Sequence, residues 1–268
     1  MLGAIIFKLR ADNSAELPLI NGRLMHAAFF NLLHETVPAL EVELHDRKNL
    51  KPFTVSFLDP LGNARSDHSA WQVRRHDEFI WRITVLNDEI LRAVLSINLE
   101  RPIQVGALKL SVDDVITEGR RDCGVMSKAE FIDEVRRSAP PTEITFRFAS
   151  PTTFRIDDRD APYPRAELIF ASLVDKWAQS EMPATADKQL IRELSTQIRL
   201  TTWSGRSKKI FFGRDRGTLA FWGEFNYNLE PLTSEARKVF LLMARFAEYA
   251  GVGRLTAQGF GQTRVVSP

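Results

Sequence analysis

The chain has 268 residues, and 44% of them are hydrophobic, which is enough for one large domain or two small domains with cores of their own. The formal net charge is only +2, so the charge of the whole chain does not indicate a nucleic-acid partner. The single cysteine excludes an intrachain disulfide and a cysteine cluster for zinc. No secretory segment is apparent, and no apolar run approaches the roughly eighteen residues of a membrane span, so the expected location is the cytoplasm.

The first half of the sequence predicts strands and helices in the order β-α-β-β-α-β. Apolar and alternating residues predict the strands, and helical spacing of apolar residues predicts the helices. Strands are expected at 2–9, 53–58, 71–75, 78–86 and 103–112, and helices at 21–34, 35–43 and 88–99. A polar loop over 44–52 ends at a proline. This order is that of the ferredoxin-like fold.

The second half repeats this order with additions. Strands are expected at 144–148, 199–204, 209–212, 219–226 and 262–266, and helices at 165–179 and 234–249. A charged connection with its own helix at 128–137 leads to Pro140-Pro141, which marks the boundary between the halves. We therefore predict an α+β protein with two tandem ferredoxin-like (RRM-like) domains, residues 1–140 and 141–268.

A glycine-rich loop over 251–261 follows the apolar helix near the C-terminus. Four glycines in eleven residues indicate a backbone with positive φ or in close contact with a neighbour. Exposed amides together with an arginine suit a phosphate-bearing ligand, whereas the alternative is a helix cap followed by a tight turn. The glycines and polar residues of this loop are Gly251, Gly253, Gly259 and Gly261, with Arg254, Thr256 and Gln258. Their spacing excludes a dinucleotide fingerprint and a P-loop.

A basic segment over 199–216 combines cations with aromatic side chains. This composition is typical of a surface that follows a phosphate backbone and stacks bases, although a solvated hairpin is the alternative. The cations are Arg199, Arg206, Lys208, Lys209, Arg214 and Arg216, and the aromatic residues are Trp203, Phe211 and Phe212.

The five histidines show neither zinc spacing nor an H-E-x-x-H motif, so we expect no metal site. Metal-free RNA cleavage needs a group that moves a proton to or from oxygen and a cation that stabilises the charged phosphorane. His45, at the start of the polar loop, and Lys51, six residues later, could supply these groups. His26 in the first helix is a further candidate. Each histidine could instead have only a packing role.

Three stretches resemble the CRISPR repeat-processing endoribonucleases of the RAMP superfamily. They are the glycine-rich loop over 251–261 after its apolar helix, the segment 44–56, and the first helix over 24–31. Together with the tandem ferredoxin-like order, this resemblance covers nearly the whole chain. It implies an enzyme that cuts precursor CRISPR RNA within its repeats, to make guide RNA for antiviral defence.

The resemblance also implies roles for individual residues. The loop histidine of the family falls on His45, as the proton-transfer group, and the lysine before the Pro-Phe-Thr strand falls on Lys51, which would stabilise the phosphorane. Some members have a tyrosine in the first helix, where this chain has Phe30. We expect His26, one turn earlier on the same face, to take that role. The family needs no metal or other cofactor, and its products carry a 5′-hydroxyl and a 2′,3′-cyclic phosphate.

RNA contacts are expected from the glycine-rich loop and from the basic segment. The expected residues are Gly251, Gly253, Arg254, Gln258, Gly259 and Gly261, with Lys208, Lys209, Arg214 and Arg216. The implied partner is repeat RNA, and the resemblance allows binding to effector-complex proteins, with the chain as a monomer or homodimer. One alternative is a RAMP subunit that binds repeat RNA without cutting it. Another is an unrelated ferredoxin-like protein with no nucleic-acid role.

Overall fold

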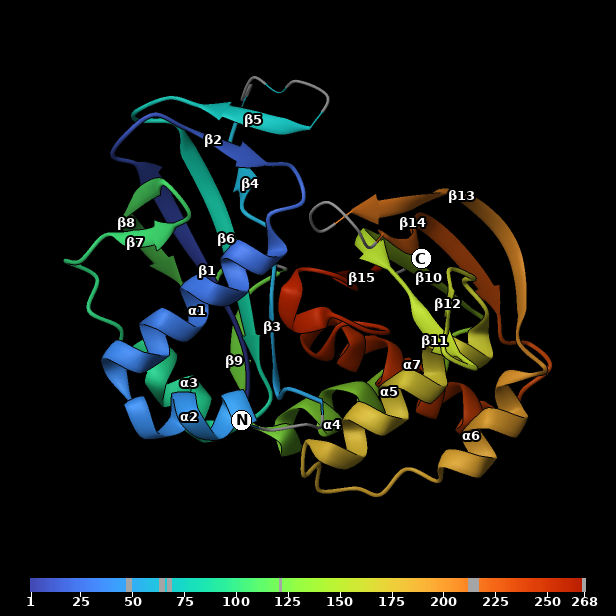
Figure 1. The fold of residues 1–268 in the computed structure, drawn as a ribbon. Helices are drawn as coiled ribbons and strands as arrows, with labels where there is room; N and C mark the ends of the chain where they lie inside the picture. Colours follow the sequence, from blue (N-terminus) through green and yellow to red (C-terminus); the bar gives the residue numbers. More distant parts are fainter. Residues whose placement is uncertain (47–49, 63–65, 67–68, 121, 212–216, 267–268) are drawn as a thin grey trace. The chain divides into compact units, whose positions relative to one another are not determined.

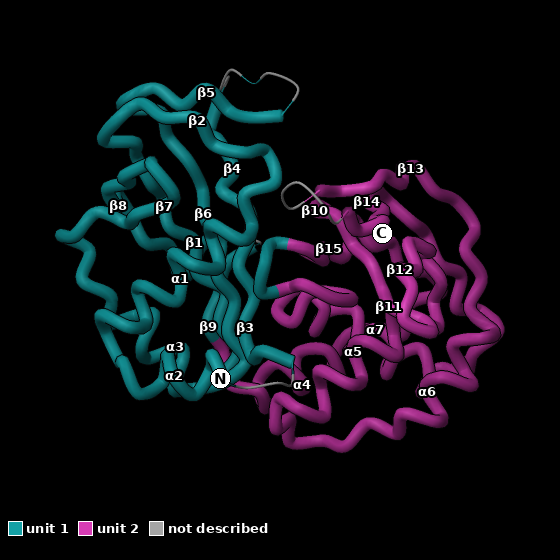
Figure 2. The backbone as a smooth tube through the Cα atoms, viewed as in Figure 1, with its two compact units in different colours: residues 1–125, 257–259 teal, residues 126–256, 260–268 magenta. Residues whose placement is uncertain are grey.

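The computed structural model describes residues 1–46, 50–62, 66, 69–120, 122–211 and 217–266 (Figure 1). The chain divides into two compact units (Figure 2). Unit 1 contains residues 1–125 and 257–259, and unit 2 contains residues 126–256 and 260–268. In the described ranges, no helix is long and apolar enough to cross a membrane.

Unit 1 is built on a sheet in the order β3-β6-β1-β8-β7, with β4 pairing with β6 and β9 with β1. Its strands are β1 (Leu2–Ala11), β3 (Phe53–Val55), β4 (Asp59–Pro60), β6 (Glu78–Val85), β7 (Ile103–Val105), β8 (Leu108–Ile116) and β9 (Gly124–Met126), whose last residue belongs to unit 2. Its helices are α1 (Gly22–Thr36), α2 (Pro38–Asp46) and α3 (Asp88–Leu95), and a separate pair is formed by β2 (Ala15–Pro18) and β5 (Ala70–Val73). The order β3-β6-β1-β8, with α1 and α3 in the two crossovers, is the ferredoxin-like arrangement.

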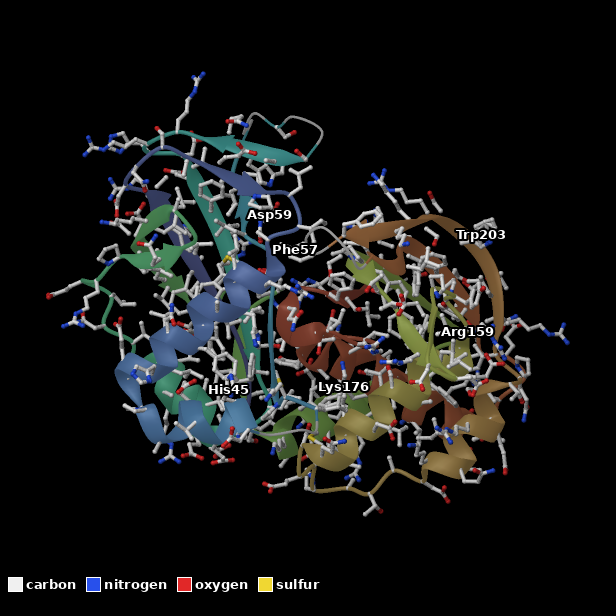
Figure 3. The ribbon with its side chains drawn as sticks, viewed as in Figure 1. His45, Phe57, Asp59, Arg159, Lys176 and Trp203 are labelled. Carbon is white, nitrogen blue, oxygen red and sulfur yellow. The ribbon has the colours of Figure 1, made fainter. Side chains whose placement is uncertain are left out.

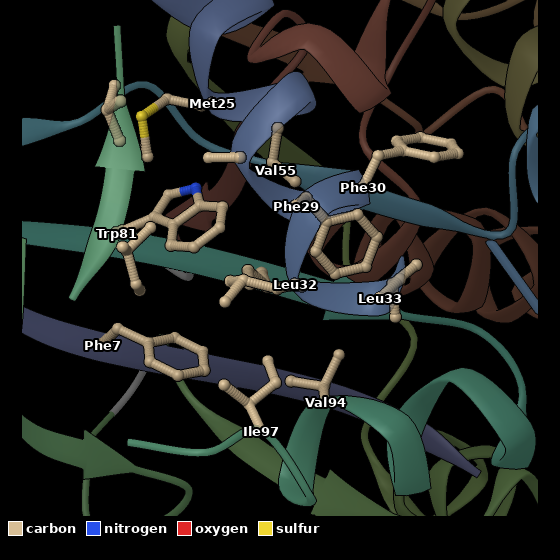
Figure 4. Packing of buried hydrophobic residues seen from close by; sticks show 14 of the residues in the cluster. Phe7, Met25, Phe29, Phe30, Leu32, Leu33, Val55, Trp81, Val94 and Ile97 are labelled. Atoms are coloured by element: carbon tan, nitrogen blue, oxygen red, sulfur yellow. The ribbon is translucent and has the colours of Figure 1, made fainter. Parts of the chain in front are cut away.

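The core of unit 1 lies between α1, α3 and the sheet (Figure 4). Phe29 on α1 packs against Phe53 with ring centroids 4.5 Å apart, and Phe7 on β1 packs against Trp81 on β6 at 5.8 Å. All four side chains are fully buried. Burying a side chain of this size contributes about 1.5–3 kcal/mol, so this cluster fixes α1 on the sheet.

Unit 2 has a sheet in the order β13-β14-β10-β15. Its strands are β10 (Glu143–Thr152), β13 (Arg199–Phe211), β14 (Gly217–Asn228) and β15 (Thr263–Val266), and a small hairpin joins β11 (Phe154–Ile156) to β12 (Arg159–Ala161). Its helices are α4 (Lys128–Arg137), α5 (Ala166–Gln179), α6 (Lys188–Ser195) and α7 (Ser234–Ala250). The short helix η1 (Thr256–Gln258) begins in unit 2, and its last two residues belong to unit 1. With α5 and α7 as the crossovers, this is a second ferredoxin-like unit, and the predicted fold class is confirmed.

The helices of unit 2 cover one face of its sheet. Phe146 on β10 packs against Phe170 on α5, which packs against Phe240 on α7, with ring centroids 6.0 and 4.6 Å apart. The opposite face carries Arg147, which is paired with Glu224 on β14. This open face is therefore available for polar side chains.

The structure differs from the sequence expectations at several places. The strand expected at 103–112 is a hairpin, because Gly106 has φ of 60° and turns the chain between β7 and β8. The two strands expected at 199–204 and 209–212 form one continuous strand, β13. The units divide after Val125 rather than at Pro140, because α4 packs on α7, where the rings of Phe131 and Tyr249 are 5.9 Å apart.

Candidate functional site

The rings of two histidines in unit 1 lie close to the ring of one phenylalanine. His26 is in the second turn of α1, and Phe30 follows one turn later with only 9% of its surface exposed. The Phe30 ring centroid is 4.7 Å from the His26 ring and 6.0 Å from the His45 ring. The tertiary fold thus brings two of the predicted catalytic residues into contact with the same Phe30 ring.

The tautomer of His26 is set by a backbone carbonyl. Nδ1 of His26 lies 2.7 Å from the carbonyl oxygen of Ala257, which belongs to the same unit. A carbonyl only accepts hydrogen bonds, so Nδ1 carries the proton and donates it, and Nε2 of the neutral ring keeps its lone pair. Burial lowers the pKa of His26, and the charges of Lys51 and His45 lower it further, against the opposing effect of the Ala257 carbonyl. His26 is therefore a neutral imidazole near neutral pH, with Nε2 as its basic atom.

His45 lies in the last turn of helix α2, and not in the loop expected from the sequence. Its side chain is 75% exposed, and Nδ1 is 3.8 Å from the exposed carboxylate of Asp46. A pair so exposed contributes little to stability. His45 is thus held mainly by its helix and by the edge of the Phe30 ring, and its imidazole is open to solvent.

Lys51 binds the C-terminal end of α2. Its Nζ donates to the carbonyl oxygen of Leu44 and, at 3.2 Å, to that of His45. Carbonyls at the C-terminal end of a helix generally lack partners within it, and the negative end of the helix dipole favours a cation there. The ammonium is therefore anchored beside His45, where its charge also acts on His26.

The tip of the glycine-rich loop is seated on α1 in unit 1. A Cβ atom on Gly22 would lie 1.9 Å from the carbonyl oxygen of Gln258. A Cβ atom on Gly259 would lie 2.3 Å from the ring of Phe57, and Gly259 has φ of 86°. Both positions therefore need glycine for close packing. This seat places the Ala257 carbonyl beside His26.

The other loop glycines also serve close backbone packing, within unit 2. Gly251 ends helix α7 with φ of 63°. Cβ atoms on Gly253 and Gly261 would lie 2.3 Å from the Thr153 carbonyl oxygen and 2.1 Å from that of Val252. The geometry thus agrees with the alternative of a helix cap followed by tight turns, and contact of these glycines with RNA stays a prediction.

Arg254, the cation of the glycine-rich loop, already has partners within unit 2. Nη1 of Arg254 is 3.4 Å from the carboxylate of Asp160, and the backbone amide of Arg254 donates to the Thr153 carbonyl. The backbone carbonyl of Gln258 lies against Gly22. An RNA phosphate would compete with Asp160 for Arg254, so the predicted contact requires that ion pair to rearrange.

Sequence reasoning missed Lys176 on α5, whose Nζ is buried among oxygen atoms of unit 2. In the sequence, Lys176 lies in a mixed helix next to Asp175 and resembles a solvated position. Only the fold shows that it points inward.

The basic segment forms the edge of the sheet in unit 2. All residues of β13 except Ile210 are exposed, and Trp203 is 64% exposed (Figure 3). Arg206 stacks on Trp222 of β14 with its guanidinium carbon 4.7 Å from the ring centroid. Lys208, two residues later, shares the open face with Arg206, while Lys209 lies on the other face, near Phe211. Arg214 and Arg216 lie outside the described residues.

Among the side chains that the structure describes, no three histidine, cysteine or acidic residues converge into a metal-ligand group.

Comparisons with known proteins identify the family of this chain. Residues 1–130 match the family model described as the CRISPR Cas6 N-terminal domain, and residues 146–263 match that of the CRISPR-associated endoribonuclease Cas6. A comparison with curated protein sequences finds no significant match.

Solved structures resemble the whole chain. The product complex of Cas6 (TTHB231) is 26% identical with a TM-score of 0.77, over 99% of this chain and 100% of that chain. Thermus thermophilus Cas6 (TTHB231) is also 26% identical, with a TM-score of 0.71 over 99% and 98%. The product complex of Cas6 (TTHA0078) is 24% identical with a TM-score of 0.77 over 99% of both chains, and this likeness concerns the fold alone. Because a Cas6 family model matches in each of its two units, the chain belongs to the Cas6 family of CRISPR-associated endoribonucleases.

Proposed function

We propose that this chain cleaves precursor CRISPR RNA within its repeats, without a metal ion, by attack of a ribose 2′-hydroxyl on the adjacent phosphate. The observation that carries the proposal is the His26 imidazole, whose Nδ1 is held by the Ala257 carbonyl so that Nε2 is the basic atom. The family relationship supports RNA processing, and the histidine pair around Phe30 supports the chemistry.

His26 is the proposed general base. Its Nε2 takes the proton of the 2′-hydroxyl, and the 2′-oxygen forms a bond to phosphorus. Burial keeps the imidazole neutral and therefore able to accept a proton near pH 7. A general base of this kind contributes about 10²–10⁴-fold to the rate.

His45 and Lys51 complete the proposed site. As the bond from phosphorus to the 5′-oxygen breaks, the leaving oxygen takes a proton from the imidazolium form of His45, whose ring is open to solvent. The phosphorane carries additional negative charge, which the ammonium of Lys51 stabilises from its position at the end of α2. The products are a 2′,3′-cyclic phosphate and a 5′-hydroxyl. Phe30 contacts both imidazoles and takes no part in proton transfer.

The RNA is held by cations and aromatic side chains of unit 2. Arg206, Lys208 and Lys209 on the exposed strand β13 contact phosphates, which gives affinity without base preference. The glycine-rich loop contributes Arg254 once its ion pair with Asp160 has opened. The cognate repeat is then selected by base edges or by hairpin shape.

The test is single-turnover cleavage of a cognate repeat RNA in EDTA, with saturating protein. His26→Ala, His45→Ala and Lys51→Ala should each bind RNA normally and cut at least ~100-fold more slowly than the wild type. The matched control is His34→Ala, because His34 is an exposed histidine on α1, the helix that carries His26, and its Nδ1 lies 3.5 Å from a carboxylate oxygen of Glu41. This control should cut at the wild-type rate.

A repeat RNA with a single 2′-deoxynucleotide at the cut site should bind and stay intact, since it lacks the nucleophile. If the wild type binds an all-ribose repeat and never cuts it in EDTA, the proposal fails. Two explanations would then remain: the chain cuts RNA only with a metal ion, or it is an RNA-binding subunit that does not cut. Cleavage after addition of Mg²⁺ would indicate the first, and intact RNA would indicate the second.

A further inference from the structure

Lys176 on α5 is labelled in Figure 3. Its Nζ is surrounded by oxygen atoms at the start of the glycine-rich loop. Its Nζ donates to the carbonyl oxygens of Ala250 and Gly251, both at 2.9 Å, and lies 3.4 Å from Oγ1 of Thr256. The side chain is only 4% exposed. One nitrogen therefore joins the last turn of α7 to the residue at which the short helix η1 begins.

The three contacts satisfy groups that would otherwise cost free energy. The carbonyls of Ala250 and Gly251 lie at the C-terminal end of α7, where carbonyls lack partners within the helix. Thr256 is itself buried, with 7% of its surface exposed. Burying a lysine costs free energy unless its nitrogen is hydrogen-bonded. Nζ and the oxygen atoms around it therefore hold one another in position.

Thr256 is joined by a peptide bond to Ala257, whose carbonyl holds Nδ1 of His26 at 2.7 Å. We propose that Lys176 is a positioning residue for RNA cleavage, which acts through Thr256 and the Ala257 carbonyl on the tautomer and orientation of His26. The inference rests on the proposed role of His26 as the base. Lys176 touches neither the substrate nor the reacting atoms in this proposal.

Loss of the hydrogen bonds made by Lys176 would have a specific chemical consequence at His26. When the Ala257 carbonyl moves away, His26 can place its proton on either ring nitrogen, and only the form protonated at Nδ1 has a basic Nε2. The carbonyl also raises the pKa of His26, against the larger effect of burial. Without the carbonyl, the pKa of His26 falls, and the acidic limb of the pH–rate profile moves to lower pH.

The experiment uses the full chain with repeat RNA and two independent variants. Lys176→Met keeps the length of the side chain and removes the nitrogen, while Thr256→Val keeps the shape and removes the hydroxyl. Both should cut about 10-fold or more slowly at saturating protein, because a misplaced catalytic group reduces the rate steeply. The Kd for RNA should be unchanged, and the acidic limb should shift down. Thr256→Ser, which keeps the hydroxyl, should restore the rate.

The surface variant Lys188→Met is the matched control, because Lys188 pairs with Asp175 on the exterior. If Lys176→Met does not fold, Thr256→Val provides the test.

If Lys176 has only a structural role, its variant should have a lower melting temperature while the acidic limb of the pH–rate profile stays where it is in the wild type. This result would overturn the inference. Wild-type rates in both variants, with a slow His26→Ala, would also overturn it and leave the proposed function intact. A wild-type rate in His26→Ala would instead refute the proposed base.

Discussion

The carbonyl oxygen of Ala257 lies 2.7 Å from Nδ1 of His26, although the two residues are 231 positions apart in the chain. This contact gives the glycine-rich loop a role that its sequence does not suggest. The loop is expected to hold phosphate with its amides, and in the structure it also presents a carbonyl to a histidine. The glycines make this possible, since Gly22 and Gly259 leave the room in which the tip of the loop is seated.

The pH dependence of cleavage should report this contact. Burial, Lys51 and His45 lower the pKa of His26 below its usual 6.5, so the basic form predominates at neutral pH. The rate should therefore be independent of the protonation of His26 at pH 7 and above, and fall only as the pH drops through the lowered pKa. Single-turnover rates measured from pH 4.5 upwards locate the inflection of the pH–rate profile. The lowest pH lies about two units below the ordinary pKa of histidine. An inflection above 6.5, or the same acidic limb in His26→Ala, would show that another group is the base.

The close packing of the glycine-rich loop on α1 can be tested by adding one methyl group at Gly22. Gly22→Ala should slow cleavage, because the added Cβ would lie 1.9 Å from the Gln258 carbonyl and displaces the loop that holds His26. Alanine in a helix is otherwise more stable than glycine by about 1 kcal/mol, so a melting temperature at or below that of the wild type would itself report the clash. Gly124→Ala is the matched control, since its Cβ would meet nothing within 4 Å. A Gly22→Ala variant that is stabilised and fully active would contradict the described seat.

The stability of the fold should depend on pH through Lys176. Burial lowers the pKa of Lys176 from 10.5 to about 7. Between these values the unfolded chain holds a proton that the folded chain has lost, so the free energy of unfolding should rise with pH, by up to about 1.4 kcal/mol per unit. Below pH 7 both states are charged at this residue and the gain is absent. Urea unfolding at pH 7, 8 and 9 should show this rise in the wild type and in Lys188→Met, and a flatter dependence in Lys176→Met. Equal slopes in all three proteins would refute the lowered pKa.

The sequence predicted the order of elements well where each element carries its own signal. Helix α4 was expected at 128–137, and in the structure it begins with a capping box formed by Ser127 and Glu130. The end of α7 at Gly251 was also predicted correctly. The prediction failed where one local sequence pattern is compatible with two different structures. A run with one internal glycine can be a bulged strand or a hairpin, and Gly106 makes a hairpin. The Arg- and Lys-rich stretch 199–211 has turn-like composition, yet pairing along the whole of β14 makes it one strand.

The candidate site was predictable only in part. His26, His45 and Lys51 could be selected because their side chains have the required chemistry, and the fold brings the two histidines around Phe30. The partner of His26 is a backbone carbonyl, and every residue has one, so no sequence pattern could single out Ala257. Lys176 was missed for a similar reason: its burial depends on tertiary packing of α5 against the end of α7, which helical periodicity does not reveal.

The exposed strand β13 should separate two kinds of RNA contact. Lys208→Ala removes one phosphate contact, so it should weaken binding equally for different RNA sequences and reduce the slope of log K against log salt by about 1. Trp203→Ala removes a 64%-exposed ring that can stack a base, which should cost about 1–3 kcal/mol of binding while leaving the salt slope unchanged. Lys188→Ala, a surface lysine on α6, controls for a general loss of positive charge. Filter binding of single-stranded and hairpin repeat RNA at four salt concentrations measures both quantities. If neither variant changes RNA binding, then β13 lies outside the RNA path, and the cations that hold the repeat must be sought elsewhere on the chain.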